Sequence, residues 1–143
     1  MLKITEIRPL STAIVVTGEK YKEDMYDDHG LIESKQGDLK TYQRVVAVGP
    51  MVRNVKVGDL VMINIMHFAV MQYDPNSLKQ DMGMNKVKEW KFNWITLTDK
   101  EGKSQDCLFM DEHDLLFAFE GEEVQGVKNP IIVPDNKKII IGS

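Results

Sequence analysis

Short apolar runs separated by polar turn residues make up most of this chain. Valine and isoleucine dominate several of the runs, and glycine, aspartate, asparagine or proline stands between them. Runs of this length with these boundaries are typical of β-strands, and almost no stretch has the period of an amphipathic helix. The runs are residues 12–16, 44–48, 60–66, 67–73, 90–97, 107–110 and 115–119. We therefore expect an all-β domain, built as a small barrel or sandwich.

The stretch from residue 19 to residue 40 departs from this pattern. It is mainly polar, its charges are concentrated in residues 20–28, and an isolated aliphatic pair, Leu31-Ile32, directly follows Gly30. Long connections of this kind are uncommon in compact domains and are usually functional or disordered. We expect residues 19–40 to form a long exposed loop, and this loop is the first candidate for a functional contact.

Three segments in the second half of the chain depart from the simple pattern of aliphatic strands. Between residues 74 and 87 neither helix nor strand is clearly indicated. Trp90, Phe92 and Trp94 then alternate with polar residues, which predicts a half-buried strand with the aromatic side chains inside; the alternative is a stacking platform for single-stranded nucleic acid. In residues 122–143, two isoleucine-rich triplets flank a Pro-Asp-Asn turn sequence, which predicts a terminal β-hairpin.

Composition narrows the range of partners and locations. A length of 143 residues suits one domain, and a formal charge of −4 without a cluster of lysine and arginine argues against nucleic acid. Cys107 is the only cysteine, so an intramolecular disulfide and a multi-cysteine zinc site are excluded; its apolar surroundings predict a buried side chain. The first residues lack a signal-peptide layout and no apolar stretch is long enough to span a membrane, so we expect a cytoplasmic protein with no membrane contact.

No catalytic signature stands out. The chain has no nucleophile-elbow, phosphate-loop or zinc-protease motif, and His29, His67 and His113 lie in separate segments. The acidic residues at 111, 112 and 114 lack the glycine and the spacing of a calcium loop, so we interpret them as a solvated turn. We expect no catalytic residues, no cofactor and no metal.

Three segments together resemble the GroES-type co-chaperonins. Residues 7–10 read Ile-Arg-Pro-Leu and lead into the aliphatic residues 14–16, like the family's first strand. Residues 45–49 (Val-Val-Ala-Val-Gly) and 55–61 (Val-Lys-Val-Gly-Asp-Leu-Val) are similar to its central block. Residues 106–116 are similar to its closing block, in which a short strand meets an acidic turn. The order and the rough spacing of the segments are kept.

The resemblance implies a fold and a function. The fold is a small GroES-like β-barrel over residues 1–121, with a mobile loop at 19–40, an enlarged hairpin insertion at 73–105 and a C-terminal extension at 122–143. The function is that of a co-chaperonin, a lid that caps a GroEL-type chaperonin in its ATP-bound state and assists protein folding. Such a lid works in the cytoplasm, or in the host cytoplasm if the protein is viral.

The resemblance also implies the docking and assembly residues. In this family a glycine followed by aliphatic residues in the mobile loop docks on the chaperonin's apical domain, and Gly30, Leu31 and Ile32 occupy the matching place. Glu33 stands where a third aliphatic residue is common. The residues alone also allow Leu31 and Ile32 to anchor the loop onto the barrel. A seven-membered ring is implied, with subunit contacts at Ile14, Val15, Phe117 and Phe119.

Some features depart from the family or leave other interpretations open. Residues 50–54 are too few for the roof hairpin that many members carry, and roofless, enlarged members occur among tailed phages. An alternative function is that of a phage or bacterial structural protein that uses the same barrel for assembly contacts. Zinc-dependent alcohol dehydrogenases share the central block, but one cysteine and no nucleotide-binding domain disfavour an enzyme accessory domain.

Overall fold

The computed structural model describes residues 2–73 and 85–126 and groups the chain into two compact units. The sheet unit contains the residues up to Glu19 together with Leu39–Gly121. The hairpin unit contains Lys20–Asp38 together with the residues from Glu122 onward. The weakly patterned residues 74–84 and the predicted hairpin around residues 134–136 lie outside the described part of the chain.

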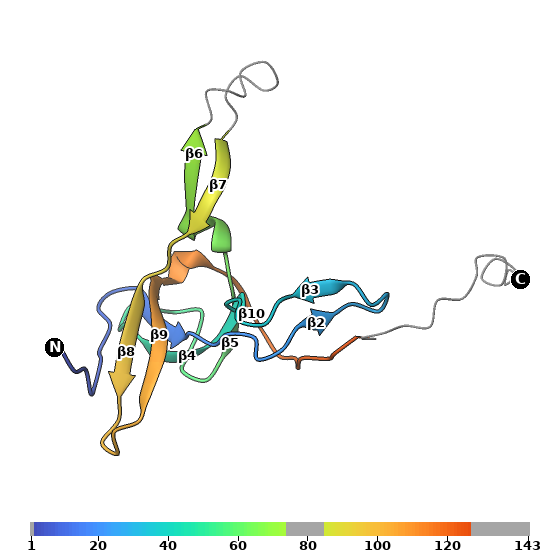
Figure 1. Ribbon diagram of the computed structural model, residues 1–143. Helices are drawn as coiled ribbons and strands as arrows, with labels where there is room; N and C mark the ends of the chain where they lie inside the picture. The colour runs from blue at the N-terminus through green and yellow to red at the C-terminus, as the bar shows by residue number, and fades with distance from the viewer. Residues whose placement is uncertain (1, 74–84, 127–143) are drawn as a thin grey trace, which may run out of the picture. The chain divides into compact units, whose positions relative to one another are not determined.

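A six-stranded antiparallel sheet forms the main part of the sheet unit (Figure 1), with the strand order β10-β5-β4-β1-β9-β8. Its strands are β1 (Ala13–Thr17), β4 (Tyr42–Val48), β5 (Leu60–Ile63), β8 (Trp94–Thr98), β9 (Ser104–Asp111) and β10 (Leu115–Phe119). Two short 3-10 helices, η1 (Ile65–Phe68) and η3 (Glu112–Asp114), precede β6 and β10. The all-β prediction is confirmed.

The sheet has two free ends in the described part of the chain. β10 and β8 are its edge strands, and no pairing between described residues joins them, so the sheet is not closed within the described part of the chain. At the β8 edge, an isolated parallel bridge pairs Ile4 with Leu97, and Thr98 N donates to Ile4 O at 2.8 Å. The N-terminal segment therefore occupies part of one edge.

The core lies against β1, whose two edges are both paired, with β4 and with β9. The alternation of strand side chains brings one set of aliphatic residues together on the same face. The buried core cluster consists of Ile14, Val16, Val45, Val61, Ile63, Phe68, Leu108 and Met110. Cys107 is fully buried in β9, as its sequence context predicts, and burial raises the pKa of its thiol.

A separate two-stranded sheet, formed by β6 and β7, differs from the insertion expected at residues 73–105. β6 (Ala69–Tyr73) pairs with β7 (Asn85–Trp90), while β8 and β9 belong to the main sheet (Figure 1). Residues 73–105 therefore contribute to two different sheets and are not one enlarged hairpin. A turn at residues 99–102 joins β8 to β9: Asp99 N donates to Lys103 O at 2.9 Å, and Gly102 has a φ of 88°.

Three chain segments meet at the start of β1. Met51 N donates to Ser11 O at 3.0 Å, and the Thr12 hydroxyl donates to a carboxylate oxygen of Asp111 at 2.7 Å. A Cβ on Gly49 would lie 2.3 Å from Ser11 O, so only glycine allows this approach. The segments around residues 11, 50 and 111 therefore depend on one another for their conformation.

In the part of the chain that the structure describes, no helix has the length and apolar character needed to cross a bilayer.

Candidate functional site

Residues 19–40 contain a β-hairpin instead of one open loop. β2 (Met25–Tyr26) pairs antiparallel with β3 (Ile32–Ser34), and Figure 1 shows the two strands side by side. The polar composition correctly indicated an exposed segment. It gave no sign of these strands, because two or three residues are too few to establish an alternating pattern. The hairpin carries all three residues of the predicted docking motif.

Backbone hydrogen bonds also order the base of the hairpin unit. Tyr21 N donates to Asp38 O at 2.9 Å, and Gly37 N donates to Tyr21 O at 2.8 Å. The Asp24 carboxylate accepts a hydrogen bond from Gln36 N at 2.8 Å. The two arms of the segment are thus joined from the base to the strands.

An aspartate-centred turn forms the tip. The Asp27 carboxylate accepts hydrogen bonds from His29 N at 2.8 Å and Leu31 N at 2.9 Å. Asp27 N in turn donates to Leu31 O at 2.9 Å, and Gly30, with a φ of 81°, takes the left-handed conformation that glycine adopts without strain. The hydrogen bond from Leu31 N, and to a lesser extent the hydrogen bond from His29 N, holds the pKa of Asp27 below its ordinary value.

The aliphatic pair at this tip is open to solvent. Leu31 is 66% exposed and Ile32 is 51% exposed, and the charged Glu33 that follows is exposed as well. The interpretation that Leu31 and Ile32 anchor the loop by burial is therefore not supported. The turn instead holds them where another molecule can contact them.

Within the sheet unit, one buried side chain holds Glu19 and Lys40, the two ends of the 19–40 segment. Gln43 in β4 is 1% exposed, and its Oε1 accepts hydrogen bonds from the Thr17 hydroxyl at 2.8 Å and from Glu19 N at 2.9 Å. Its Nε2 donates to Glu19 O at 2.9 Å and to Lys40 O at 2.8 Å. Glu19 and Lys40 are the residues where the segment leaves and rejoins the sheet. Sequence reasoning missed this residue, because a glutamine in a strand gives no sign of which way it points.

The predicted subunit-contact residues fall into two groups. Ile14 and Val15 are fully buried in the central strand β1, so neither side chain offers a surface to a neighbour, and this part of the prediction is corrected. Phe117 is 52% exposed on the edge strand β10 and stacks edge-on against Phe119, with ring centroids 5.9 Å apart. Phe119 is half-buried against Tyr42, so β10 remains a candidate contact strand.

The aromatic triplet does not form one buried strand. Trp90 ends β7 and Trp94 begins β8, and they are 43% and 44% exposed, so their predicted burial is wrong. Only Phe92 lies inward, stacked on Phe68 with ring centroids 4.9 Å apart. Trp94 packs closely on Gly18, where a Cβ would come within 2.5 Å of the indole ring. The period-2 pattern was misleading because residues 91–93 are not in a strand.

The acidic turn after β9 is used for backbone capping. Asp111 accepts a hydrogen bond from His113 N at 3.0 Å, and Asp114 accepts one from Asp111 N at 2.9 Å, which caps η3 reciprocally. The hydrogen bond from His113 N and then that from Thr12 lower the pKa of Asp111. Across residues 2–73 and 85–126, no group of three or more potential metal-ligating side chains comes together.

The histidines do not converge on one another. His67 Nδ1 lies 2.9 Å from an Asp114 oxygen, and its Nε2 lies 3.1 Å from Asn64 Nδ2, so both ring nitrogens have partners. His29 is in the hairpin tip, and His113 is largely exposed beside Asp111. Among the described residues, no histidine ring is hydrogen-bonded to a serine hydroxyl or a cysteine thiol. Cys107 is fully buried.

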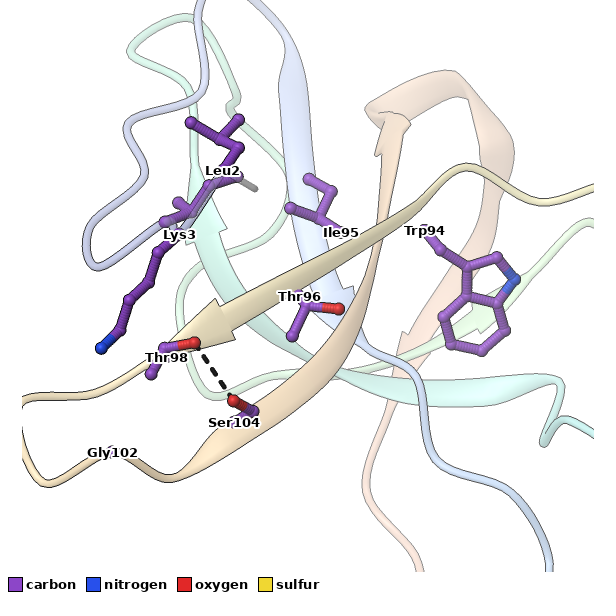
Figure 2. Close-up of a pocket in the computed structure, with 9 residues that line it drawn as sticks. Leu2, Lys3, Trp94, Ile95, Thr96, Thr98, Gly102 and Ser104 are labelled. Carbon is purple, nitrogen blue, oxygen red and sulfur yellow. Dashed lines mark hydrogen bonds between the residues drawn. The ribbon is translucent and has the colours of Figure 1, made fainter.

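An open groove of about 640 Å³ runs between the N-terminal segment and β8 (Figure 2). Leu2 and Lys3 lie on one side of β8, and Thr98 bonds to Ser104 at 3.1 Å across the β8–β9 hairpin. Lys3 is the only charged side chain among the residues that line the groove. The hydroxyls of Thr96, Thr98 and Ser104 in its lining are already hydrogen-bonded within the β8–β9 hairpin, so we assign no small-molecule site to this groove.

A scan against known protein families finds no model that matches this sequence, and a search of curated proteins finds no match either.

Proposed function

We propose that this chain is a co-chaperonin subunit that docks on a GroEL-type chaperonin in its ATP-bound state through Leu31 and Ile32. The observation that carries the proposal is the position of these two aliphatic side chains. They are 66% and 51% exposed at the tip of an ordered hairpin, within a segment that is mainly polar. Aliphatic side chains presented in this way suit an apolar groove on a partner.

The energetics fit a lid that must bind and release. Fully burying an aliphatic side chain is worth roughly 1.5–3 kcal/mol, and Leu31 and Ile32 still have about half or more of their surface to bury. One hairpin therefore binds weakly after association costs are subtracted. Several hairpins on a ring of subunits bind with useful avidity, and all release together when the chaperonin moves its grooves.

The arrangement of the sheet supports the proposal. The segments that resemble the co-chaperonins contribute β1, β4, β5, β9 and β10, which are neighbours in the order β10-β5-β4-β1-β9. The hydrogen bonds around Ser11, Gly49 and Asp111 join the same segments. A resemblance spread over three stretches of sequence thus corresponds to one contiguous set of strands.

A closed ring of about seven subunits is part of the proposal. The edge strand β10 exposes Phe117 and also Leu116, which is 58% exposed. Among residues 2–73 and 85–126, no strand pairs with the outer edge of β10. An apolar edge strand left uncovered favours pairing with another chain, and a neighbouring subunit in a ring would cover it. The free edge of β10 therefore replaces the buried Ile14 and Val15 as the expected contact.

Gel filtration of the protein mixed with a GroEL-type chaperonin tests the proposal. With ATP, we expect both proteins to elute together ahead of the chaperonin alone; without nucleotide, we expect them to elute separately. Co-elution that does not depend on nucleotide, or none at all, would contradict the proposal and favour the structural-protein alternative.

A double variant tests the docking contact. Leu31→Ser combined with Ile32→Ser should abolish co-elution, with little change in melting temperature because both side chains are already exposed. Met51→Ser combined with Val57→Ser is a matched control, since these side chains are 58% and 59% exposed on turns of the sheet unit. Equal loss of co-elution in both double variants would show that general surface polarity matters and that the hairpin tip does not.

A further inference from the structure

The outer edge of β2 is bonded to a segment from the other end of the chain. Tyr26 N donates to Gln125 Oε1 at 2.7 Å, and Gln125 Nε2 donates to Asp24 O at 2.8 Å. Gly126 N donates to Tyr26 O at 3.0 Å. Figure 1 shows the segment that follows β10 passing beside β2. These bonds satisfy backbone groups that the short hairpin leaves unpaired on this edge.

Position 126 has room only for glycine. A Cβ at this position would lie 2.3 Å from Tyr26 O and 2.3 Å from Asp27 O, which is closer than any side chain tolerates. The clash would be with backbone atoms, so no side-chain adjustment relieves it. Gly121, earlier in the same stretch, would meet only the Phe119 ring at 3.5 Å, an ordinary contact.

The hairpin itself is too short to be stable alone. β2 has two residues and β3 has three, and an isolated two-stranded hairpin is marginally stable at best in water. The contacts from Gln125 and Gly126 act as a partial third strand next to β2. We infer that these two residues form a brace that keeps the hairpin ordered, and that Gln125 is a positioning residue for the Leu31–Ile32 tip.

The consequence for binding rests on the proposed function. If only the ordered hairpin docks, the apparent affinity falls in proportion to the fraction of chains in which the hairpin is formed. Losing the two hydrogen bonds of the Gln125 side chain should shift the equilibrium between formed and open hairpin by roughly 5- to 150-fold, with the lower end favoured because both bonds are exposed. Gln125 and Gly126 would therefore set the strength of capping through the order of the hairpin.

Amide hydrogen exchange in the full-length protein tests the brace without any chaperonin. The reporter is the Asp27 amide, which bonds across the tip to Leu31 O, and the Val16 amide in β1 is the internal reference. Gln125→Ala and Gly126→Ala should each speed exchange at Asp27 about 5-fold or more while leaving Val16 unchanged. Gly121→Ala is the matched control and should behave as wild type. Unchanged exchange at Asp27 in both brace variants would overturn the inference.

Capping assays test the positioning role separately. Gln125→Ala should raise the concentration needed for half-maximal capping, and a disulfide across the hairpin should restore it in the same variant. Met25 and Ser34 are paired in the strand register, so Met25→Cys with Ser34→Cys supplies that disulfide. Faster exchange at Asp27 with unchanged capping, or no rescue by the disulfide, would refute the positioning role. If the wild type does not cap at all, the proposed function fails, and the exchange data alone decide on the brace.

Discussion

Replacing Gln43 should remove the hydrogen bonds that hold Glu19 and Lys40 against β4 within the sheet unit. Its buried amide makes four hydrogen bonds, two through Oε1 and two through Nε2. Each contributes about 0.5–1.5 kcal/mol net, so the four are worth about 2–6 kcal/mol. Glu19 is exposed and Lys40 is half-buried, so water can replace part of what is lost. We expect a cost of about 2–4 kcal/mol from Gln43→Ala.

The isosteric change Gln43→Glu makes a sharper test. A carboxylate oxygen in place of Nε2 would face the carbonyl oxygens of Glu19 and Lys40 at 2.9 and 2.8 Å, so the ionised form is repelled and the folded-state pKa is raised. A loss of about 2–4 kcal/mol at neutral pH corresponds to a rise of roughly 1.5–3 pKa units above the unfolded value of about 4.3. The variant should therefore approach wild-type stability near pH 4 and lose stability as the pH rises through about 6–7.

Urea unfolding of wild type and Gln43→Glu between about pH 4 and 8, a range that spans the expected pKa, measures this difference. Gln105→Glu, at an exposed glutamine of β9, is the control and should show no such pH dependence. A stability difference that is constant across the pH range would refute the hydrogen-bond geometry assigned to Gln43.

Three further predictions concern the size of the assembly, the exposure of the two tryptophans and the titration of Asp27. Light scattering should give a mass of about seven subunits, and a stable monomer at micromolar concentration would contradict the ring. Acrylamide should quench Trp90 and Trp94 in the native protein and unfolding should shift their emission only slightly, because they are 43% and 44% exposed; a blue-shifted, quench-resistant emission would contradict this. The hairpin tip should loosen only as the pH falls through the lowered pKa of Asp27, so the Leu31 amide resonance should titrate with a midpoint below 3.8; a higher midpoint would contradict the turn.

The strands of the main sheet could be predicted from the sequence because their pattern follows from burial. β1 and β9 face the core with aliphatic side chains, and such runs bounded by glycine and aspartate indicate strands whatever their partners. Pairing is harder to predict, because hydrophobic pattern alone does not say which strand lies next to which. The sequence does not reveal that β1 lies between β4 and β9, with Ile14 and Val15 fully buried. For this reason Ile14 and Val15 were wrongly chosen as contact residues.

The aromatic segment shows a different limit. Trp90 and Trp94 have the spacing of one strand face, but the chain passes from β7 to β8 between them. A two-residue period is informative only within one continuous strand, and large apolar residues on a surface are common. The Trp94 ring can pack where it does because residue 18 is a glycine without a Cβ. Gly18 lies some 76 positions away in sequence, so the residues around Trp94 give no sign of that contact.

The sequence predicted which residues form the candidate site, but it did not predict the contacts that hold the hairpin in place. An aliphatic pair in a polar segment marked Leu31 and Ile32, and the Asp27 to Gly30 spacing is a turn signal that can be recognised in retrospect. Gln125 and Gly126 lie far along the chain from the hairpin that they contact. Such long-range contacts depend on the folded arrangement, and no local propensity specifies them.

Photo-crosslinking from the hairpin tip tests the central claim most directly. A benzophenone amino acid in place of Leu31, which is 66% exposed, can be introduced without disturbing the core, and the same group in place of Val57, which is 59% exposed, is the control. With a GroEL-type chaperonin and ATP, illumination should crosslink position 31 to an apical domain, while position 57 and the nucleotide-free mixture should give no crosslink. Absence of a crosslink from position 31 in the presence of ATP, or equal crosslinking from both positions, would contradict docking through the hairpin tip.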